Sequence, residues 1–181
     1  IQQIKEIKQK DSVGPIAVFS APMGCTDALI KIGLSHSQEC GLPVEPIFEI
    51  YERLAKQYVN SELLKQAQQD IDNYRRLTVK TLEFVNKRFS GNAKARTLIF
   101  GGELCMATLM KYILQSHGID ACTIPVEEWP VVTDDNFEDA AANYNLSRKR
   151  LNSLTAPLEA GKVVCMAGFF GVTQDGLETI L

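Results

Sequence analysis

Residues 15–30 read PIAVFSAPMGCTDALI, an apolar run that breaks into a loop of small and polar residues before an apolar segment resumes. Two later segments show the same pattern: TLIF at 97–100 leads into GGELCMATLM, and VVCMA at 163–167 leads into GFFGVTQDG. Each apolar run is predicted to be a buried strand. Because ligands of open α/β sheets bind beyond the carboxyl ends of parallel strands, the three loops predict the position of a binding site.

The segments between these strands have the apolar spacing of helices. The chain therefore alternates strands with helices, which predicts an α/β fold, a three-layer αβα sandwich with a mostly parallel sheet. The helical excursion at about 42–90 is longer than a crossover needs, so we expect it to cover a face or edge of the sheet. The other expected elements are helices at 26–38, 45–59, 61–89 (ended by Ser90 and Gly91), 103–117 and near 136–155, and a strand at 121–124.

Both ends of the chain carry apolar residues. Ile1, Ile4 and Ile7 recur at helical spacing, and a right-handed crossover into a parallel strand at 15–20 calls for another strand before that helix. The chain ends on the apolar run at 177–181. The pattern predicts a single domain over residues 1–181 that is incomplete at both ends.

Composition excludes several classes of protein. With 19 basic and 22 acidic residues among 181, the net charge is −3, and no basic run is present to bind nucleic acid. No apolar stretch approaches the roughly 20 residues that cross a membrane. Five cysteines without a paired spacing predict free thiols in a reducing, cytoplasmic compartment.

Glu103 is the carboxylate of greatest interest, because it follows Gly101 and Gly102 directly after a predicted strand. Two interpretations stand side by side. A glutamate in the first turn of a helix is stabilised by the helix dipole, which makes a purely structural cap plausible. The two glycines would alternatively let a ligand approach, and the carboxylate would then bind an ammonium group or orient an acid.

The first and third loops offer hydroxyls and backbone amides. Ser20 and Thr26 flank Gly24, and each is also an ordinary turn or cap residue. Together, two hydroxyls beside a glycine turn can donate to carboxylate or phosphate oxygens. In the third loop we expect Gly168 and Gly171 to bracket an exposed turn, with one of Phe169 and Phe170 over the ligand and the other in the core.

The acidic segment TDDNFEDAA at 133–141 admits a general acid/base pair or a Mg²⁺ site, but Thr133 and its aspartates are predicted to cap the helix that follows. His36 and Cys40 lack the further ligands that a zinc site needs, so we expect no metal site. The sequence contains no P-loop, no GxGxxG after a strand and no GxSxG elbow.

Three segments in this order resemble the amino-acid kinase family, and within it the aspartate kinases. FSAPMGCTDALI is similar to the family's Ser-Ala-Met-Gly…Thr-Asp loop, and FGGELCMATLM to its Gly-Glu-x-x-Ser helix start. AGFFGVTQDGLETIL is similar to its Gly-Phe-x-Gly strand end and the turn that follows. The resemblance covers nearly the whole chain.

The resemblance implies phosphoryl transfer from ATP, with Mg²⁺, to the side-chain carboxylate of L-aspartate. It implies that Glu103, Ser20, Thr26 and Phe169 bind the substrate, and it identifies no catalytic residue in this chain. The family's Lys-Phe-Gly-Gly strand would precede Ile1 and its Gly-Arg-Gly-Gly-Ser-Asp segment would follow Leu181. It therefore implies the substrate half of the domain, inactive alone, within a homo-oligomeric protein.

Two alternatives stay open beside this interpretation. One is another member of the family, such as a glutamate kinase, which the length of the pocket around Glu103 and Phe169 would distinguish. Met106 stands where the family motif has serine, which leaves room for an amino-acid-binding paralogue without catalysis.

Overall fold

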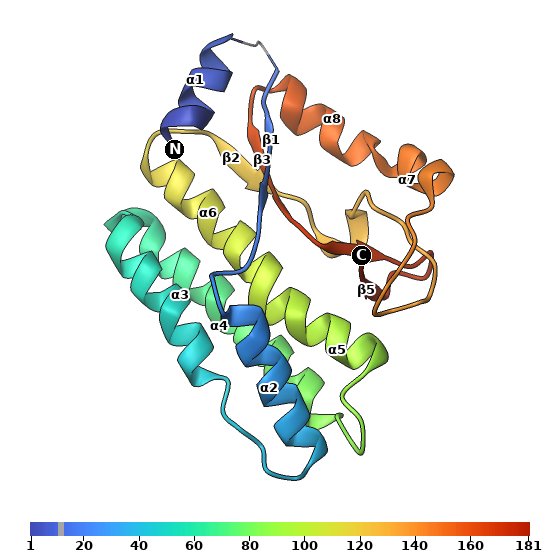
Figure 1. Ribbon diagram of the computed structural model, residues 1–181. Coiled ribbons are helices and arrows are strands. Elements are labelled where there is room, and N and C mark those ends of the chain that lie inside the picture. The colour runs from blue at the N-terminus through green and yellow to red at the C-terminus, as the bar shows by residue number, and fades with distance from the viewer. Residues whose placement is uncertain (11–12) are drawn as a thin grey trace.

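A three-stranded parallel sheet forms the centre of the fold in the computed structural model, which describes residues 1–10 and 13–181 (Figure 1). Its order is β1 (Ile16–Phe19), β3 (Val163–Ala167), β2 (Ala121–Thr123). Ile16 pairs with Val164 and Ala121 with Val163, so the carboxyl ends of β1 and β3 lie side by side. The predicted α/β fold with a parallel sheet is confirmed.

Helices cover both faces of this sheet. α6 packs against all three strands on one face, and α8 packs against β3 on the other. α3 and α4 belong to the predicted helical excursion and pack against α6. The excursion therefore covers this central helix, which in turn covers the sheet. The helices are α1 (Gln2–Lys10), α2 (Cys25–Ser37), α3 (Glu45–Tyr58), α4 (Ser61–Glu83), α5 (Gly91–Leu98), α6 (Leu104–Ser116), α7 (Tyr144–Arg150) and α8 (Asn152–Glu159), with a 3-10 turn η2 at Val126–Glu128.

The predicted strand at 97–100 is wrong, because these residues are helical. α5 continues through a π-helical turn, η1 (Ile99–Glu103), directly into α6. A short, fully buried apolar run fits a buried helix as well as a strand, since neither leaves an alternation of polar and apolar residues. Gly101 and Gly102 therefore lie inside a helix and not in a loop after a strand.

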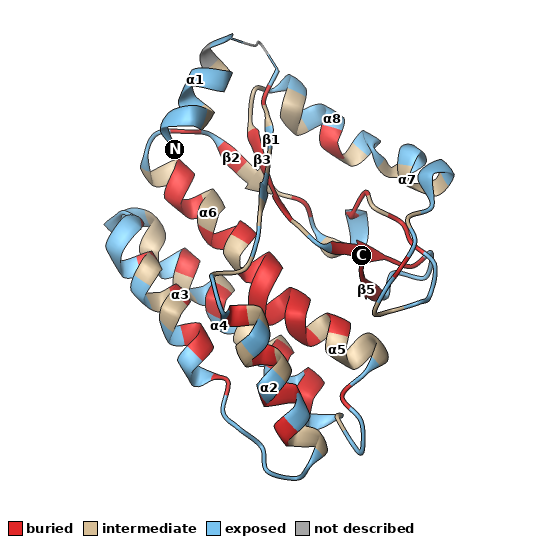
Figure 2. Ribbon diagram, viewed as in Figure 1, coloured by how far each residue is buried: buried red, intermediate tan, exposed pale blue. Residues whose placement is uncertain are grey.

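The joined helix Gly91–Ser116 is the central helix of the domain. With 26 residues, it is long and apolar enough to span a membrane, but 83% of its most apolar 18-residue stretch is buried inside the protein. Figure 2 shows the α6 part of this helix as mostly buried. Its apolar character is therefore explained by its position under the sheet and beneath α3 and α4.

The long helix predicted over 61–89 ends earlier than expected. α4 ends at Glu83, residues 84–90 form a connection, and Ser90 is the residue that precedes α5. The connection returns to the core at Phe89, whose ring fills the space beside Gly33 of α2. A Cβ added at Gly33 would lie 2.2 Å from that ring.

Gly33→Ala is therefore expected to lower the free energy of unfolding by about 2 kcal/mol, because overpacking a full site forces a ring or a helix to shift. Urea denaturation of the chain measures the change. Lys31→Ala, an exposed position on the same helix, is the control and should change the stability by less than about 0.5 kcal/mol. An equal effect of the two substitutions would contradict the packing.

The helix predicted near 136–155 begins later, at Tyr144, where the side chain of Asn143 accepts a bond from the amide of Leu146. The segment before it forms a loop because its backbone bonds to other strands. Ala140 donates to the carbonyl of Ile180, and Thr133 to that of Val172. These partners belong to a short antiparallel hairpin, β4 (Phe170–Val172) and β5 (Glu178–Ile180).

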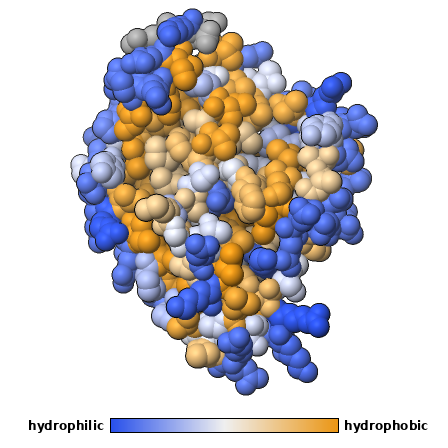
Figure 3. Space-filling view, viewed as in Figure 1, coloured by the Kyte–Doolittle hydropathy of each residue, from blue (hydrophilic) through white to orange (hydrophobic). Residues whose placement is uncertain are grey.

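β1 is an edge strand of the sheet that the structure describes. Its outward side chains Ile16 and Val18 are exposed. Figure 3 shows hydrophobic surface across the centre of the face on which β1 lies.

Candidate functional site

The first loop, residues 20–24, lies between the end of β3 and the π-helical turn. On one side, the amide of Gly168 donates to the carbonyl of Phe19 at 2.9 Å, and a Cβ on Gly168 would lie 3.6 Å from Ser20 Oγ. On the other side, a Cβ on Gly102 would lie 3.2 Å from Ala21 Cβ. The loop therefore brings Ser20 and the turn η1 to one place.

Glu103 is the last residue of η1 and is 7% exposed. The backbone amide of Ala21 donates a hydrogen bond to its carboxylate, while Oε2 is buried without any hydrogen-bond partner. Burial raises the pKa of Glu103, and the bond from Ala21 lowers it by a smaller amount. A buried carboxylate oxygen without a partner is costly, and a cation or donor from a ligand would satisfy it.

The helix-cap interpretation of Glu103 is wrong, because Glu103 lies in the interior of the helix 91–116 and not in its first turn. The predicted role of the glycine pair changes with it. A Cβ added at Gly101 would lie 2.8 Å from the side chain of Leu29 in α2, and one added at Gly102 would meet the side chain of Ala21. These glycines let the first loop and α2 approach Glu103, so protein and not ligand occupies the space beside them.

Gly24 and Thr26 form the start of α2 on this loop. Gly24 has a left-handed backbone, φ 78°, and a Cβ added there would meet nothing within 4 Å, while Thr26 is half-buried in the first helical turn. First-turn amides have no carbonyl partner within their own helix, and the helix dipole favours an anion there. The start of α2 can therefore receive a carboxylate or phosphate group.

Phe169 follows Gly168 at the end of β3 with φ 64°, a left-handed conformation that is rare outside glycine. Its side chain is 52% exposed, whereas Phe170 is buried, so the two rings diverge as predicted. The amide of Leu181 donates to the Phe169 carbonyl at 3.2 Å. The predicted four-residue turn is only Gly168–Phe169, because Gly171 is buried in β4 against Thr133.

Tyr51 of α3 was not among the predicted site residues, although it lies against the same turn. Its hydroxyl is 3.0 Å from the carbonyl oxygens of both Gly101 and Gly102. Tyr51 is fully buried, whereas Tyr58 on the same helix is exposed. The spacing of Ile47, Tyr51 and Ala55 by four residues was the signal that marks the buried face.

The raised pKa of Glu103 predicts how stability depends on pH. The unfolded chain releases this proton near the ordinary value of about 4.3, and the folded chain at a higher pH. The folded state therefore loses stability as the pH rises through that window, and the loss is complete above the folded pKa.

Glu103→Gln should therefore be more stable than the wild type at pH 7, by about 1 kcal/mol, and the difference should shrink at pH 4. Urea denaturation at the two pH values measures it. An advantage that is the same at both values would show that the carboxylate's charge is not its cause.

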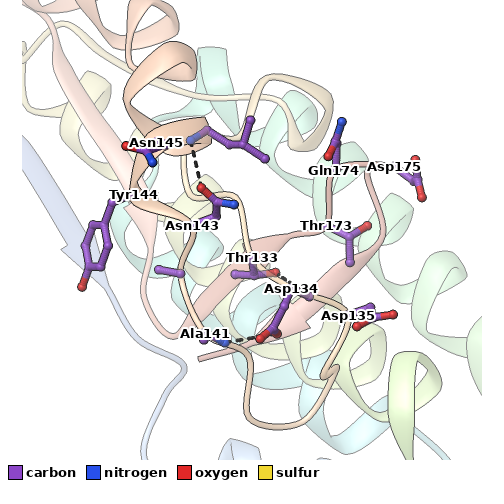
Figure 4. A pocket seen from close by; sticks show the side chains of 12 residues that line it. Thr133, Asp134, Asp135, Ala141, Asn143, Tyr144, Asn145, Thr173, Gln174 and Asp175 are labelled. Carbon is purple, nitrogen blue, oxygen red and sulfur yellow. Dashed lines mark hydrogen bonds between the residues drawn. The ribbon is translucent and has the colours of Figure 1, made fainter.

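The acidic segment lines a separate hollow of about 660 Å³ between the loop at 133–146 and the β4–β5 turn (Figure 4). Asp134 does not cap a helix, since its carboxylate accepts from the amides of Asn136 and Ala141 within the loop. Within residues 1–10 and 13–181, no group of three or more His, Cys, Asp or Glu side chains is arranged to hold a metal ion. All five cysteines are free.

The fold and the residues around the first loop form an α/β domain with one candidate ligand-binding site. Its site pairs a buried carboxylate, one oxygen of which has no partner, with a hydroxyl-bearing loop and the start of a helix, beyond the carboxyl ends of two parallel strands. Such a site suits a small molecule that carries both an ammonium and an acidic group.

Comparison with known proteins places this domain in a family. The model of the Amino acid kinase family matches residues 1–181, and the chain therefore belongs to that family. A search of curated protein sequences found no significant match.

Solved structures of aspartokinases share the fold. Escherichia coli aspartokinase III in complex with aspartate and ADP (R-state) matches with a TM-score of 0.76 at 19% identity, covering 99% of this chain and 39% of that one. The same enzyme with lysine and aspartate (T-state) gives 0.75 at 20%, covering 99% and 40%. Clostridium acetobutylicum aspartate kinase gives 0.54 at 14%, covering 99% and 38%. The chain thus spans about two fifths of the length of these relatives.

Proposed function

We propose that this chain is the amino-acid-binding part of an ATP-dependent kinase that phosphorylates the side-chain carboxylate of L-aspartate. The observation that carries the proposal is the buried, unpartnered Oε2 of Glu103 beside the first loop. Membership in the Amino acid kinase family supports the reaction class, and the aspartate-bound relatives support the choice of acceptor.

In this proposal, Glu103 accepts hydrogen bonds from the α-ammonium group of the substrate. The ion pair would satisfy Oε2, and a buried charge-assisted bond of this kind is among the stronger polar interactions. Burying the Glu103 carboxylate without a partner is unfavourable in the ligand-free protein. Binding a cation offsets part of this free-energy cost. An acid without an ammonium group offers no such compensation.

The acidic end of the substrate would lie toward the first loop. Ser20 Oγ and Thr26 Oγ1 are donors there, and the start of α2 favours negative charge. Phe169, exposed at the end of β3, would contact the substrate's carbon chain. Discrimination between aspartate and the longer glutamate would then depend on the distance between Glu103 and this loop.

Phosphoryl transfer depends mainly on positioning and on neutralising the charge of the phosphates. ATP and Mg²⁺ are the partners that the proposal requires. The described part of the chain contains no cluster of metal-ligating side chains, so we assign no metal ligand and derive no metal-dependent step from it. The contribution of this chain is to bind and orient the acceptor carboxylate.

ADP release by the full-length gene product tests the proposal. We expect release that depends on L-aspartate, is at least about 100-fold weaker with L-glutamate, and is nearly lost in Glu103→Gln. ADP release with glutamate alone would move the assignment to a glutamate kinase. Binding of aspartate without turnover of any acid would favour an amino-acid-binding paralogue.

A further inference from the structure

Resting on the proposed function, we propose that Tyr51 is a positioning residue for Glu103, acting through the π-helical turn. The side chain lies on α3, is fully buried and points its hydroxyl at the turn that carries Glu103. It is separated in sequence from Glu103 by 52 residues, and nothing in the substrate assignment requires it. We assign it the role of fixing the orientation of the Glu103 carboxylate.

The Tyr51 hydroxyl joins three helices. It shares its proton between the carbonyl oxygens of Gly101 and Gly102, each at 3.0 Å, and Cys25 Sγ of α2 lies 3.6 Å away. Cys25 Sγ is in turn 3.7 Å from the Gly101 carbonyl. Since Cys25 precedes Thr26, the same cluster fixes the start of α2 relative to the turn.

The turn needs such support because of its geometry and composition. The amide of Leu104 bonds to the carbonyl of Ile99, five residues back, where an α-helix would bond four residues back. Gly101 and Gly102 have the widest conformational freedom of any residue type, so the local sequence does little to fix the shape of the turn, and contacts from neighbouring elements must hold it. Such turns are unusual in helices and are frequent at functional sites.

The direction of the Glu103 side chain depends on this turn. A peptide group is planar, so anchoring the Gly102 carbonyl also orients the amide of Glu103. If the turn relaxed to the ordinary α-helical repeat, residue 103 would rotate about the helix axis and its carboxylate would leave Ala21. The hydroxyl of Tyr51 thus stabilises the wide turn that aims Oε2 at the ligand.

The experiment compares the affinities of L-aspartate and succinate for the full-length gene product by calorimetry. Succinate is the same dicarboxylate without the ammonium group, so the ratio of the two affinities reports the contribution of the ammonium group, which the proposal assigns to Glu103. Tyr51→Phe removes only the hydroxyl. Tyr74→Phe is the matched control, since its hydroxyl bonds Thr108 on α6 at 3.0 Å, five residues beyond Glu103.

We expect Tyr51→Phe to reduce the preference for L-aspartate about tenfold or more while the affinity for succinate stays within about twofold. Tyr74→Phe should leave the preference unchanged. In the double variant with Glu103→Gln, the preference should be no lower than in Glu103→Gln alone, because Tyr51 acts through Glu103.

A lower melting temperature with an unchanged preference in Tyr51→Phe would overturn the proposal and leave Tyr51 as a packing residue. A wild-type protein that binds aspartate no better than succinate would instead overturn the proposed function, and this inference with it. If Tyr51→Phe does not fold, NMR of the wild type provides the test. The protein is labelled with carbon-13 at the tyrosine ring carbon that bears the hydroxyl. The Tyr51 signal should shift with aspartate and not with succinate, and equal responses to both would contradict the coupling.

Discussion

Glu103→Gln is expected to weaken binding of L-aspartate by about 100-fold, because the substitution removes the charge that pairs with the ammonium group in a buried site. Truncating one partner of a buried charge pair costs about 3 kcal/mol, which corresponds to that factor. Isothermal titration calorimetry of the full-length gene product measures it. The affinity for succinate should change by less than about threefold, since succinate does not use this contact.

Glu83→Gln is the control for this prediction, because Glu83 is an exposed carboxylate at the end of α4. Its substitution should leave both affinities unchanged. Equal losses of aspartate and succinate binding in Glu103→Gln would mean that the variant disturbs the whole site. In that case the ammonium contact would have to be abandoned.

Trp129→Ala is expected to lower the free energy of unfolding by about 4 kcal/mol. Trp129 is 1% exposed, stacks on Phe170 with ring centroids 4.1 Å apart, and donates from its indole nitrogen to the Phe170 carbonyl. Removing the ring leaves a cavity where the chain after β2 meets β4. It also removes the hydrogen bond to the Phe170 carbonyl.

Urea denaturation of the chain measures the loss, and Phe84→Ala is the control. Phe84 is an aromatic residue with 77% of its surface exposed, so its removal should cost less than about 0.5 kcal/mol. Trp129→Phe, which keeps a ring but not the hydrogen bond, should fall between them. A change below about 1 kcal/mol in Trp129→Ala would contradict the packing of β4.

The strands and the first loop could be predicted from local pattern. Residues 15–20 and 163–167 are apolar runs that end in small residues, and each is a strand of the parallel sheet within one residue of its predicted bounds. Residues 97–100 have the same apolar character and are helical. A helix and a strand are told apart by the spacing of their apolar residues, and a segment that is buried on all sides has no such spacing. Only the tertiary fold then decides between helix and strand.

The candidate site could be predicted in its residues but not in its geometry. The two glycines before Glu103 mark it as a candidate in the sequence, and the structure places it beside the predicted first loop. The reason for the glycines was wrong, because Ala21 and Leu29 occupy the space assigned to a ligand. These contacts join residues 81 and 72 positions apart in the sequence, and such close approach leaves no local pattern. Tyr51 was missed for the same reason, since its partners lie 50 and 51 residues away.

A crystal structure of the full-length gene product with L-aspartate tests the central claim most directly. We predict that the α-ammonium nitrogen lies within about 3 Å of Glu103 Oε2, with a substrate carboxylate near Ser20 and the start of α2. Aspartate bound in the hollow at residues 133–146, or bound beyond β1 and β3 with Oε2 still unpartnered, would contradict the assignment of Glu103.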